Sequence, residues 1–107
     1  MIQQNSLAFT EDKRRQLLGL PLSLSAKLLL VVLDEITGVG EFCCPPLADL
    51  SRLMGCSEHV ARTAIKEAER LGFLETEKLP GKTTSYRIEW SAITQTESED
   101  FNVNRYL

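Results

Sequence analysis

The chain has 107 residues, of which 43% are hydrophobic and 25% charged, and its formal net charge is -3 at pH 7. This length suits one globular domain with a single core, and the composition excludes a fibrous or largely disordered chain. The longest apolar run, residues 28–33, is only six residues long, too short to span a bilayer, and residues 1–15 lack a secretory signal pattern, so we expect a cytoplasmic protein without membrane contact.

The first segment, residues 1–19, reads as an N-terminal extension that contains a short helix. Thr10 is suited to cap this helix, because its hydroxyl can accept hydrogen bonds from the backbone N–H groups of the first turn. Leu17, Leu18 and Leu20 are predicted to form its apolar side, and Pro21 to stop it.

A central helix is predicted over residues 22–38, which read LSLSAKLLLVVLDEITG. Ser23 or Ser25 suits its start, and Gly38 suits its end because glycine accepts a positive φ. Length, the serine cap and the weak β-branched content favour a helix over a buried strand. The continuous apolar run predicts packing on more than one side, so we expect this helix to be the scaffold of the core.

Residues 42–44 fit a brief strand, because the residue before a proline is pushed toward extended geometry. Pro46 would then start the next helix, where its missing N–H costs little. Three apolar residues of that helix are predicted to face the core: Leu47, Leu50 and Met54.

Residues 47–74 have the pattern of two helices joined by a tight turn. Gly55 is predicted to break the first helix and Ser57 to cap the second, which we expect from Ser57 to Leu71. Three- and four-residue spacing puts one set of residues on a single packing face: Ala61, Ala64, Ile65, Ala68 and Leu71. The opposite face carries polar and basic side chains: His59, Arg62, Thr63, Lys66 and Arg70. One face is thus expected to pack while the other meets a partner.

After Gly72 the pattern changes to alternation, which predicts two strands over residues 73–78 and 83–90. Between them, residues 79–82 (LPGK) suit a type II turn, because proline presets φ and glycine accepts a positive φ. Tyr86, Ile88 and Trp90 alternate onto one face, which we expect to pack on the helices. The free tip carries basic and hydroxyl residues: Lys78, Lys82, Thr83 and Thr84.

The last segment, residues 91–107, is a polar, acidic tail. Up to Arg87 the chain has eleven Lys and Arg against eleven Asp and Glu, whereas from Ile88 onward Arg105 alone stands against four acidic residues. The negative charge therefore belongs to the C-terminal end, and it does not argue against phosphate binding by the rest of the chain. Two alternatives remain open for the tail: disorder, or docking on this or another protein.

The cysteine content gives a further alternative. Cys43, Cys44 and Cys56 are an odd number, and we expect reduced thiols. Together with His59 they reach the number of ligands that a zinc site needs, but the second closely spaced cysteine pair is missing, so we favour buried thiols and expect no metal or cofactor. One histidine and scattered acidic residues form no catalytic arrangement, so we expect no enzyme.

Three helices followed by a hairpin, with a helix-turn-helix in the last two helices, resemble the winged helix-turn-helix superfamily. More narrowly, residues 22–42 and 45–74 resemble domains of phage and plasmid replication-initiation proteins and of small bacterial transcriptional regulators. The most specific parts are the Ser-Ala-Lys opening of the scaffold helix and residues 55–74, GCSEHVARTAIKEAERLGFL. The resemblance covers residues 20–90 and implies a mainly α fold, with a three-helix core and a β-hairpin wing. The family usually has larger aliphatic residues at Cys56, Ala61 and Ala68. Two alternatives follow: a closer helix approach, with Leu50, Met54 and Ile65 filling the space, or an unusual role for Cys56.

The resemblance also implies that the second helix of the motif is a recognition helix, which enters the major groove of DNA. On this basis we assign a DNA-binding surface on the helix (Ser57, His59, Arg62, Thr63, Lys66 and Arg70) and on the wing (Lys78, Lys82, Thr83 and Thr84). Arg62 is the strongest candidate for base readout, whereas Lys66, Arg70 and the wing are expected to reach phosphates.

These residues favour sequence-specific binding of double-stranded DNA by a transcriptional regulator, which we expect to act as a homodimer on a two-fold site. One alternative keeps DNA but changes the role: a replication-initiation or recombination accessory module of a mobile element. The other is a winged-helix protein adaptor without DNA binding, because a fold alone does not fix a function. The C-terminal tail is a further candidate surface for a protein partner.

Overall fold

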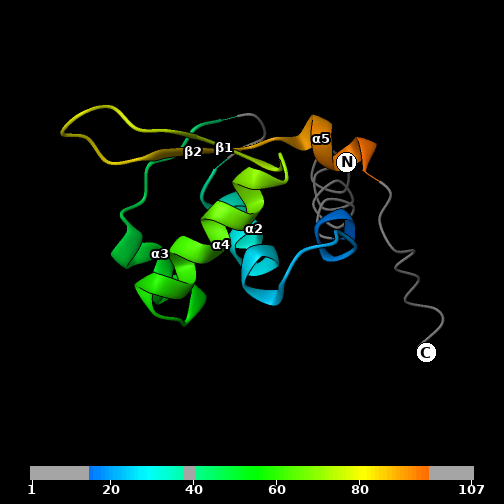
Figure 1. Cartoon of the computed structure of the whole chain (residues 1–107), viewed down its shortest axis with the longest axis horizontal. Coiled ribbons are helices and arrows are strands. Elements are labelled where there is room, and N and C mark those ends of the chain that lie inside the picture. Colours follow the sequence, from blue (N-terminus) through cyan, green and yellow to red (C-terminus); the bar gives the residue numbers. More distant parts are fainter. Residues whose placement is uncertain (1–14, 38–40, 97–107) are drawn as a thin grey trace, which may run out of the picture.

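The computed structural model describes residues 15–37 and 41–96. Its elements are α2 (Leu24–Ile36), α3 (Leu47–Met54), α4 (Glu58–Arg70), β1 (Leu74–Glu77), β2 (Ser85–Ile88) and α5 (Trp90–Gln95). The helices α2, α3 and α4 pack beneath the hairpin of β1 and β2, whose tip extends past α3 (Figure 1). This is the predicted order of a winged helix-turn-helix.

The central helix is α2, as its apolar sequence predicts. Ser23 caps it, because the Ser23 hydroxyl accepts a hydrogen bond from the Ala26 N–H at 3.3 Å. Four residues at helical spacing are buried on its inner side: Ala26, Leu29, Leu30 and Leu33. The C-cap is Thr37, and Gly38, which was predicted to end the helix with a positive φ, lies outside the described residues.

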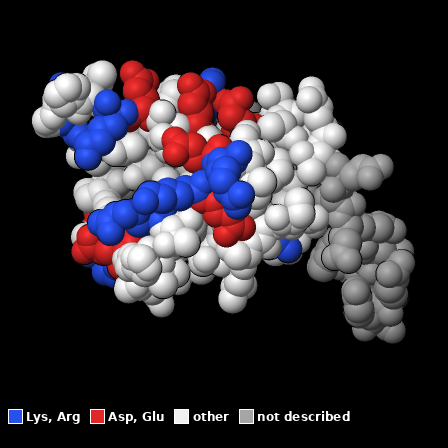
Figure 2. Space-filling model, viewed as in Figure 1, with Lys and Arg blue, Asp and Glu red and all other residues white. Residues whose placement is uncertain are grey.

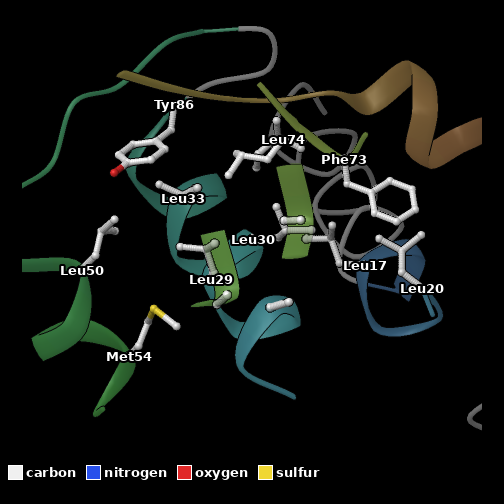
Figure 3. Packing of buried hydrophobic residues seen from close by; sticks show 14 of the residues in the cluster. Leu17, Leu20, Leu29, Leu30, Leu33, Leu50, Met54, Phe73, Leu74 and Tyr86 are labelled. Atoms are coloured by element: carbon white, nitrogen blue, oxygen red, sulfur yellow. The ribbon is translucent and has the colours of Figure 1, made fainter. Parts of the chain in front are cut away.

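The core extends on both sides of α2 (Figure 3). Leu50 and Met54 of α3 lie at one end of it, and Leu17, Leu20 and Phe73 lie at the other. Each large aliphatic side chain that is fully buried contributes about 1.5–3 kcal/mol relative to an exposed one. Six elements therefore share one hydrophobic interior.

The turn between α3 and α4 depends on Gly55 and Ser57. Gly55 has φ 74°, a left-handed conformation that costs glycine no steric clash. The N–H groups of Gly55 and Cys56 then donate to carbonyls of the last turn of α3, which closes that helix end. Ser57 caps α4, because its hydroxyl accepts from the Val60 N–H at 3.1 Å. Both predicted turn residues have their predicted roles.

The packing face of α4 consists of three alanines. Ala61, Ala64 and Ala68 are all 0% exposed, and the contact between α4 and α2 is the most extensive contact between two helices. Because each of these side chains is a single methyl group, the backbone of α4 can approach α2 closely. Leu50 and Met54 belong to the same buried cluster as these alanines. The closer helix approach expected from small residues at 61 and 68 stays a prediction.

The hairpin is shorter than predicted but has the predicted inner face. β1 pairs with β2 in antiparallel register, with Leu74 opposite Ile88 and Thr76 opposite Tyr86. Leu74, Tyr86 and Ile88 are buried against the helices. The strand predicted at residues 42–44 is reduced to one bridge, in which Cys43 and Tyr86 exchange backbone hydrogen bonds of 2.9 and 2.7 Å.

Three predictions at the ends of elements were wrong. Trp90 begins α5 instead of continuing the second strand, because the three-residue step to buried Ile93 fits a helical turn. Leu71 is 42% exposed, since α4 ends at Arg70 and Leu71 is its C-cap. Leu18 is 46% exposed, on the outer side of the helical turn at residues 15–18. The predicted start of that helix, including Thr10, lies outside the described residues.

One polar interaction connects the start of α2 to α4. The Ser23 N–H donates to Glu67 Oε2 at 2.8 Å, and the Ser23 hydroxyl donates to Glu67 Oε1 at 2.7 Å. These two hydrogen bonds lower the pKa of the Glu67 carboxyl below its usual value, and the bond from the Ser23 hydroxyl has the larger effect. Glu67 thus holds the capping residue of one core helix from the side of another.

Replacing Ala64 by leucine tests the packing of α4 on α2. Ala64→Leu is expected to lower the free energy of unfolding by about 1–3 kcal/mol, because extra methyl groups must separate the two helices. Ala48→Leu is the matched control, since Ala48 is an exposed alanine of α3 and a surface change alters stability by only about 0.5 kcal/mol. Urea denaturation followed by circular dichroism measures both. An equal, small effect at the two positions would contradict the close packing.

Replacing Glu67 by glutamine tests the interaction with Ser23. A carboxyl whose folded-state pKa is lowered stabilises the fold above its unfolded pKa, about 4.3 for glutamate, and this stabilisation is lost as the pH falls through the folded-state pKa. Glu67→Gln is therefore expected to be less stable than the parent at pH 7, with the difference shrinking below pH of about 4. Denaturation curves at several pH values measure it, with Glu77→Gln as control. A difference that persists in acid would contradict this account.

Candidate nucleic-acid interface

A groove of about 490 Å³ separates the outer face of α4 from the inner side of the hairpin. Its walls come from three parts of the chain. These are Pro45, Pro46 and Leu47 at the start of α3, Arg62, Ile65, Lys66 and Glu69 of α4, and Thr76, Lys78, Lys82, Thr83, Thr84 and Tyr86 of the hairpin. The apolar part of its lining consists of the two prolines, Leu47, Ile65 and Tyr86, and both α4 and the hairpin contribute cationic side chains.

The polar face of α4 is exposed because the alanines occupy its packing face. Arg62, Lys66 and Arg70 follow one another at four-residue steps, and all three are exposed. Arg62 and Lys66 line the groove, whereas Arg70 lies beyond it. Ser57 and His59 are exposed at the N-terminal end of the helix.

Two hydroxyl groups of this face already have roles within the helix. The Thr63 hydroxyl donates to the His59 carbonyl at 3.0 Å, and the Ser57 hydroxyl accepts from the Val60 N–H. Each oxygen keeps further hydrogen-bonding capacity for a partner. Their positions are therefore fixed by the helix itself before any partner binds.

The tip of the wing has the predicted type II turn. Gly81 has φ 74°, and the Lys82 N–H donates to the Leu79 carbonyl at 3.0 Å. Lys78, Lys82 and Thr83 are exposed at this tip. The turn therefore carries two lysines at the end of the hairpin, on the open side of the groove.

The base of the wing is fixed more firmly than its tip. Tyr86 is 5% exposed and is held to the segment before α3 through Cys43. Burial raises the pKa of the Tyr86 hydroxyl, and a hydrogen bond with Thr84 acts in the opposite direction. Burial also raises the pKa of the Cys43 thiol, with a smaller effect of Cys44, so the thiol form is favoured.

Lys and Arg side chains form a band along α4 and gather again at the tip of the hairpin (Figure 2). Acidic side chains lie over the strands and also beside both ends of the band. Among the described residues, no carboxylate forms an ion pair with Arg62, Lys66, Lys78 or Lys82. These four charges are available to an anionic partner.

Six of the ten residues predicted to bind DNA line the groove together: Arg62, Lys66, Lys78, Lys82, Thr83 and Thr84. The other four lie outside the groove lining: the N-cap residue Ser57, and His59, Thr63 and Arg70 of α4. Sequence reasoning missed several groove residues, notably Glu69, Thr76 and Tyr86. The alternation of the hairpin could have found two of them, since Thr76 and Tyr86 are paired on its inner face.

One arginine of the hairpin has a different environment. The Arg87 guanidinium forms ion pairs with Glu75 and, at 2.9 Å, with Glu89, and it lies 5.1 Å from the centre of the Phe42 ring. It alternates with Tyr86 and Ile88 and therefore lies on the outer face of the wing. Arg87 stabilises the wing rather than joining the groove.

The alternative metal site is not assembled. Within residues 15–37 and 41–96, no three His, Cys, Asp or Glu side chains are close enough to hold a metal ion, so Cys43, Cys44, Cys56 and His59 do not converge. All three thiols are free, and Cys43 and Cys56 are half-buried whereas Cys44 is exposed. The prediction of buried thiols is therefore confirmed only in part.

The same described residues contain no helix with the length and apolar character that crossing a bilayer requires.

A family model for a helix-turn-helix domain matches residues 20–74, which span α2, α3, α4 and the start of β1. A search of curated proteins found no match. The match supports DNA binding in general. Because it covers more than half of the 107 residues and the hairpin follows directly, the chain belongs to this helix-turn-helix domain family and has its winged form.

Proposed function

We propose that this protein binds double-stranded DNA in a sequence-specific manner, with α4 in the major groove and the wing against a neighbouring backbone. The observation that carries the proposal is the basic groove, in which Arg62 and Lys66 of α4 stand opposite Lys78 and Lys82 of the hairpin. The major groove of B-form DNA is about 12 Å wide and admits one α-helix. The groove of the protein, with cations on both walls, suits the sugar–phosphate strand that borders the major groove of the DNA.

The residues divide by the part of DNA that each reaches. Arg62 is the candidate for base readout, because a guanidinium can donate two hydrogen bonds to guanine. Ser57, His59 and Thr63 are candidates for bases or phosphates at the exposed start of α4. Lys66, Arg70 and the residues of the wing tip are assigned to phosphates, which position the protein without reading sequence.

We further propose a transcriptional regulator that acts as a homodimer and carries out no catalysis. A single α4 reads few base pairs, and two copies related by a two-fold axis would read two half-sites about one helical turn apart. A replication-initiation or recombination accessory module uses the same interface, so the role is decided by where on a genome the protein binds. In both roles the DNA would bind the same basic groove.

Selection of genomic fragments by the purified protein tests these proposals together. A recovered motif with two-fold symmetry is expected for the homodimer, and motifs upstream of genes are expected for a regulator. Motifs confined to replication or recombination sites would favour the accessory role. Absence of any salt-dependent affinity for duplex DNA would contradict DNA binding and leave the protein-adaptor alternative.

Two substitutions separate base readout from phosphate contact. Arg62→Ala is expected to weaken binding to the selected site by about ten- to hundredfold, and to weaken binding to random duplex much less. Lys82→Ala is expected to weaken both alike and to lower the slope of log affinity against log salt by about one. Fluorescence anisotropy with labelled duplexes measures both.

The control for these variants is Arg15→Ala. Arg15 is exposed, and the helical turn that carries it lies at the opposite end of the molecule from the wing tip (Figure 1). Its removal changes the net charge as much as Arg62→Ala does but should leave both affinities nearly unchanged. Equal losses on selected and random duplex for Arg62→Ala would remove Arg62 from base readout.

A further inference from the structure

The basic groove contains one acidic residue among the described residues that line it, Glu69 of α4. Glu69 follows Lys66 by three residues, so it lies almost one turn closer to the C-terminal end of the helix and to the base of the wing. The groove therefore changes its charge along its length. Its cations lie toward the tip, and its one carboxylate lies at the base.

The position of the Glu69 carboxylate is fixed by the hairpin. Glu69 Oε2 accepts a hydrogen bond from the Thr76 hydroxyl of β1, and Thr76 lies opposite Tyr86 in the register of the two strands. The pKa of the Tyr86 hydroxyl is raised first by burial, then by Cys43 and least by the Glu69 charge. The carboxylate is thus held between α4 and β1, beside Tyr86.

The acidic character continues beside this point. A second, shallower hollow adjoins Gly72 and is lined by three carboxylates, those of Glu69, Glu75 and Glu89. Glu75 and Glu89 are both paired with Arg87. Among the described residues, Glu69 forms no ion pair.

This arrangement has a direct consequence for an anionic polymer. A phosphate near Arg62, Lys66 and the wing tip is attracted, whereas a phosphate near Glu69 is repelled by a like charge at short range. A DNA strand can therefore occupy the tip end of the groove but is disfavoured at its base. Any docking register that needs a phosphate at the base loses affinity.

We infer that Glu69 is a specificity-determining residue, whose carboxylate confines the DNA backbone to the end of the groove formed by Arg62, Lys66 and the wing tip. The inference rests on the proposed DNA-binding function. Random duplex can bind in many registers, whereas the selected site binds in one. Glu69 therefore lowers the affinity for random duplex more than the affinity for the selected site. Glu69 thus widens the ratio between the two affinities.

The test compares Glu69→Gln with Glu77→Gln on the selected duplex and on random duplex. Glutamine keeps an oxygen that can accept from Thr76, so the local geometry is preserved while the charge is lost. Glu77 follows Thr76 in β1 but alternates onto the outer face of the wing. Glu77→Gln changes the net charge as much as Glu69→Gln does. Glu69→Ala is the second neutral variant, and thermal melting verifies that each variant folds.

Glu69→Gln is expected to bind random duplex about three- to tenfold more tightly than the parent at low salt, with a smaller gain on the selected site. The gain should shrink as salt rises, because ions screen the repulsion between exposed charges. Thr76→Val tests whether the hydrogen bond alone causes the effect, because this variant removes the bond but keeps the Glu69 charge. We expect its affinity ratio to stay near that of the parent.

Two outcomes overturn the inference separately from the function. If the parent binds duplex DNA but Glu69→Gln and Glu77→Gln change the affinity ratio equally, Glu69 has no special position. If Thr76→Val lowers the ratio as much as Glu69→Gln does, the effect comes from geometry and not from charge. Failure of the parent to bind any duplex would instead overturn the proposed function itself.

Discussion

The close packing of α4 on α2 is the constraint on which the rest of the structure depends. The buried face of α4, which packs on α2, is formed by Ala61, Ala64 and Ala68. Because these three side chains face the core, the side chains on the opposite face of α4 project outward. Glu67 reinforces the contact by accepting two hydrogen bonds from Ser23 at the start of α2. The orientation of the exposed basic side chains of α4 is therefore a property of the core.

The wing takes its position from the same helix. Only Leu71, Gly72 and Phe73 separate α4 from β1, and buried Phe73 anchors the start of the hairpin in the core. On the other strand, Cys43 holds Tyr86 from the segment that precedes α3. The base of the hairpin is thus fixed at two points, while its tip is held by its own turn. The groove between α4 and the wing is consequently preformed at its base.

The helices and the turn could be predicted from local signals. Ser57 and Gly55 act on the backbone within a few residues, and the spacing of the alanines is a direct record of the buried face. The ends of elements were harder, because Leu71 and Trp90 follow the same periodic patterns as their neighbours but lie where the chain changes direction. The spacing of apolar residues indicates the buried face of a helix or strand only as far as that helix or strand continues.

The role of Glu69 could not be read from the sequence for a different reason. In the sequence it is one charge in a run of acidic and basic residues on a helix, a pattern that commonly marks a solvent-exposed face. Its environment is set by Thr76, and that contact depends on the angle at which β1 leaves α4. An angle between two elements is a property of tertiary packing and has no signature in local spacing.

The order of the strands has a consequence for how copies of the protein meet. β2 lies between β1 and the Cys43 bridge, so within the described residues β1 is the outer strand of the wing. An open strand edge is a template for pairing with another chain, and charged side chains suppress such pairing. β1 carries Glu75 and Glu77. Two copies of this strand edge would present like charges to each other, which disfavours pairing between their sheets.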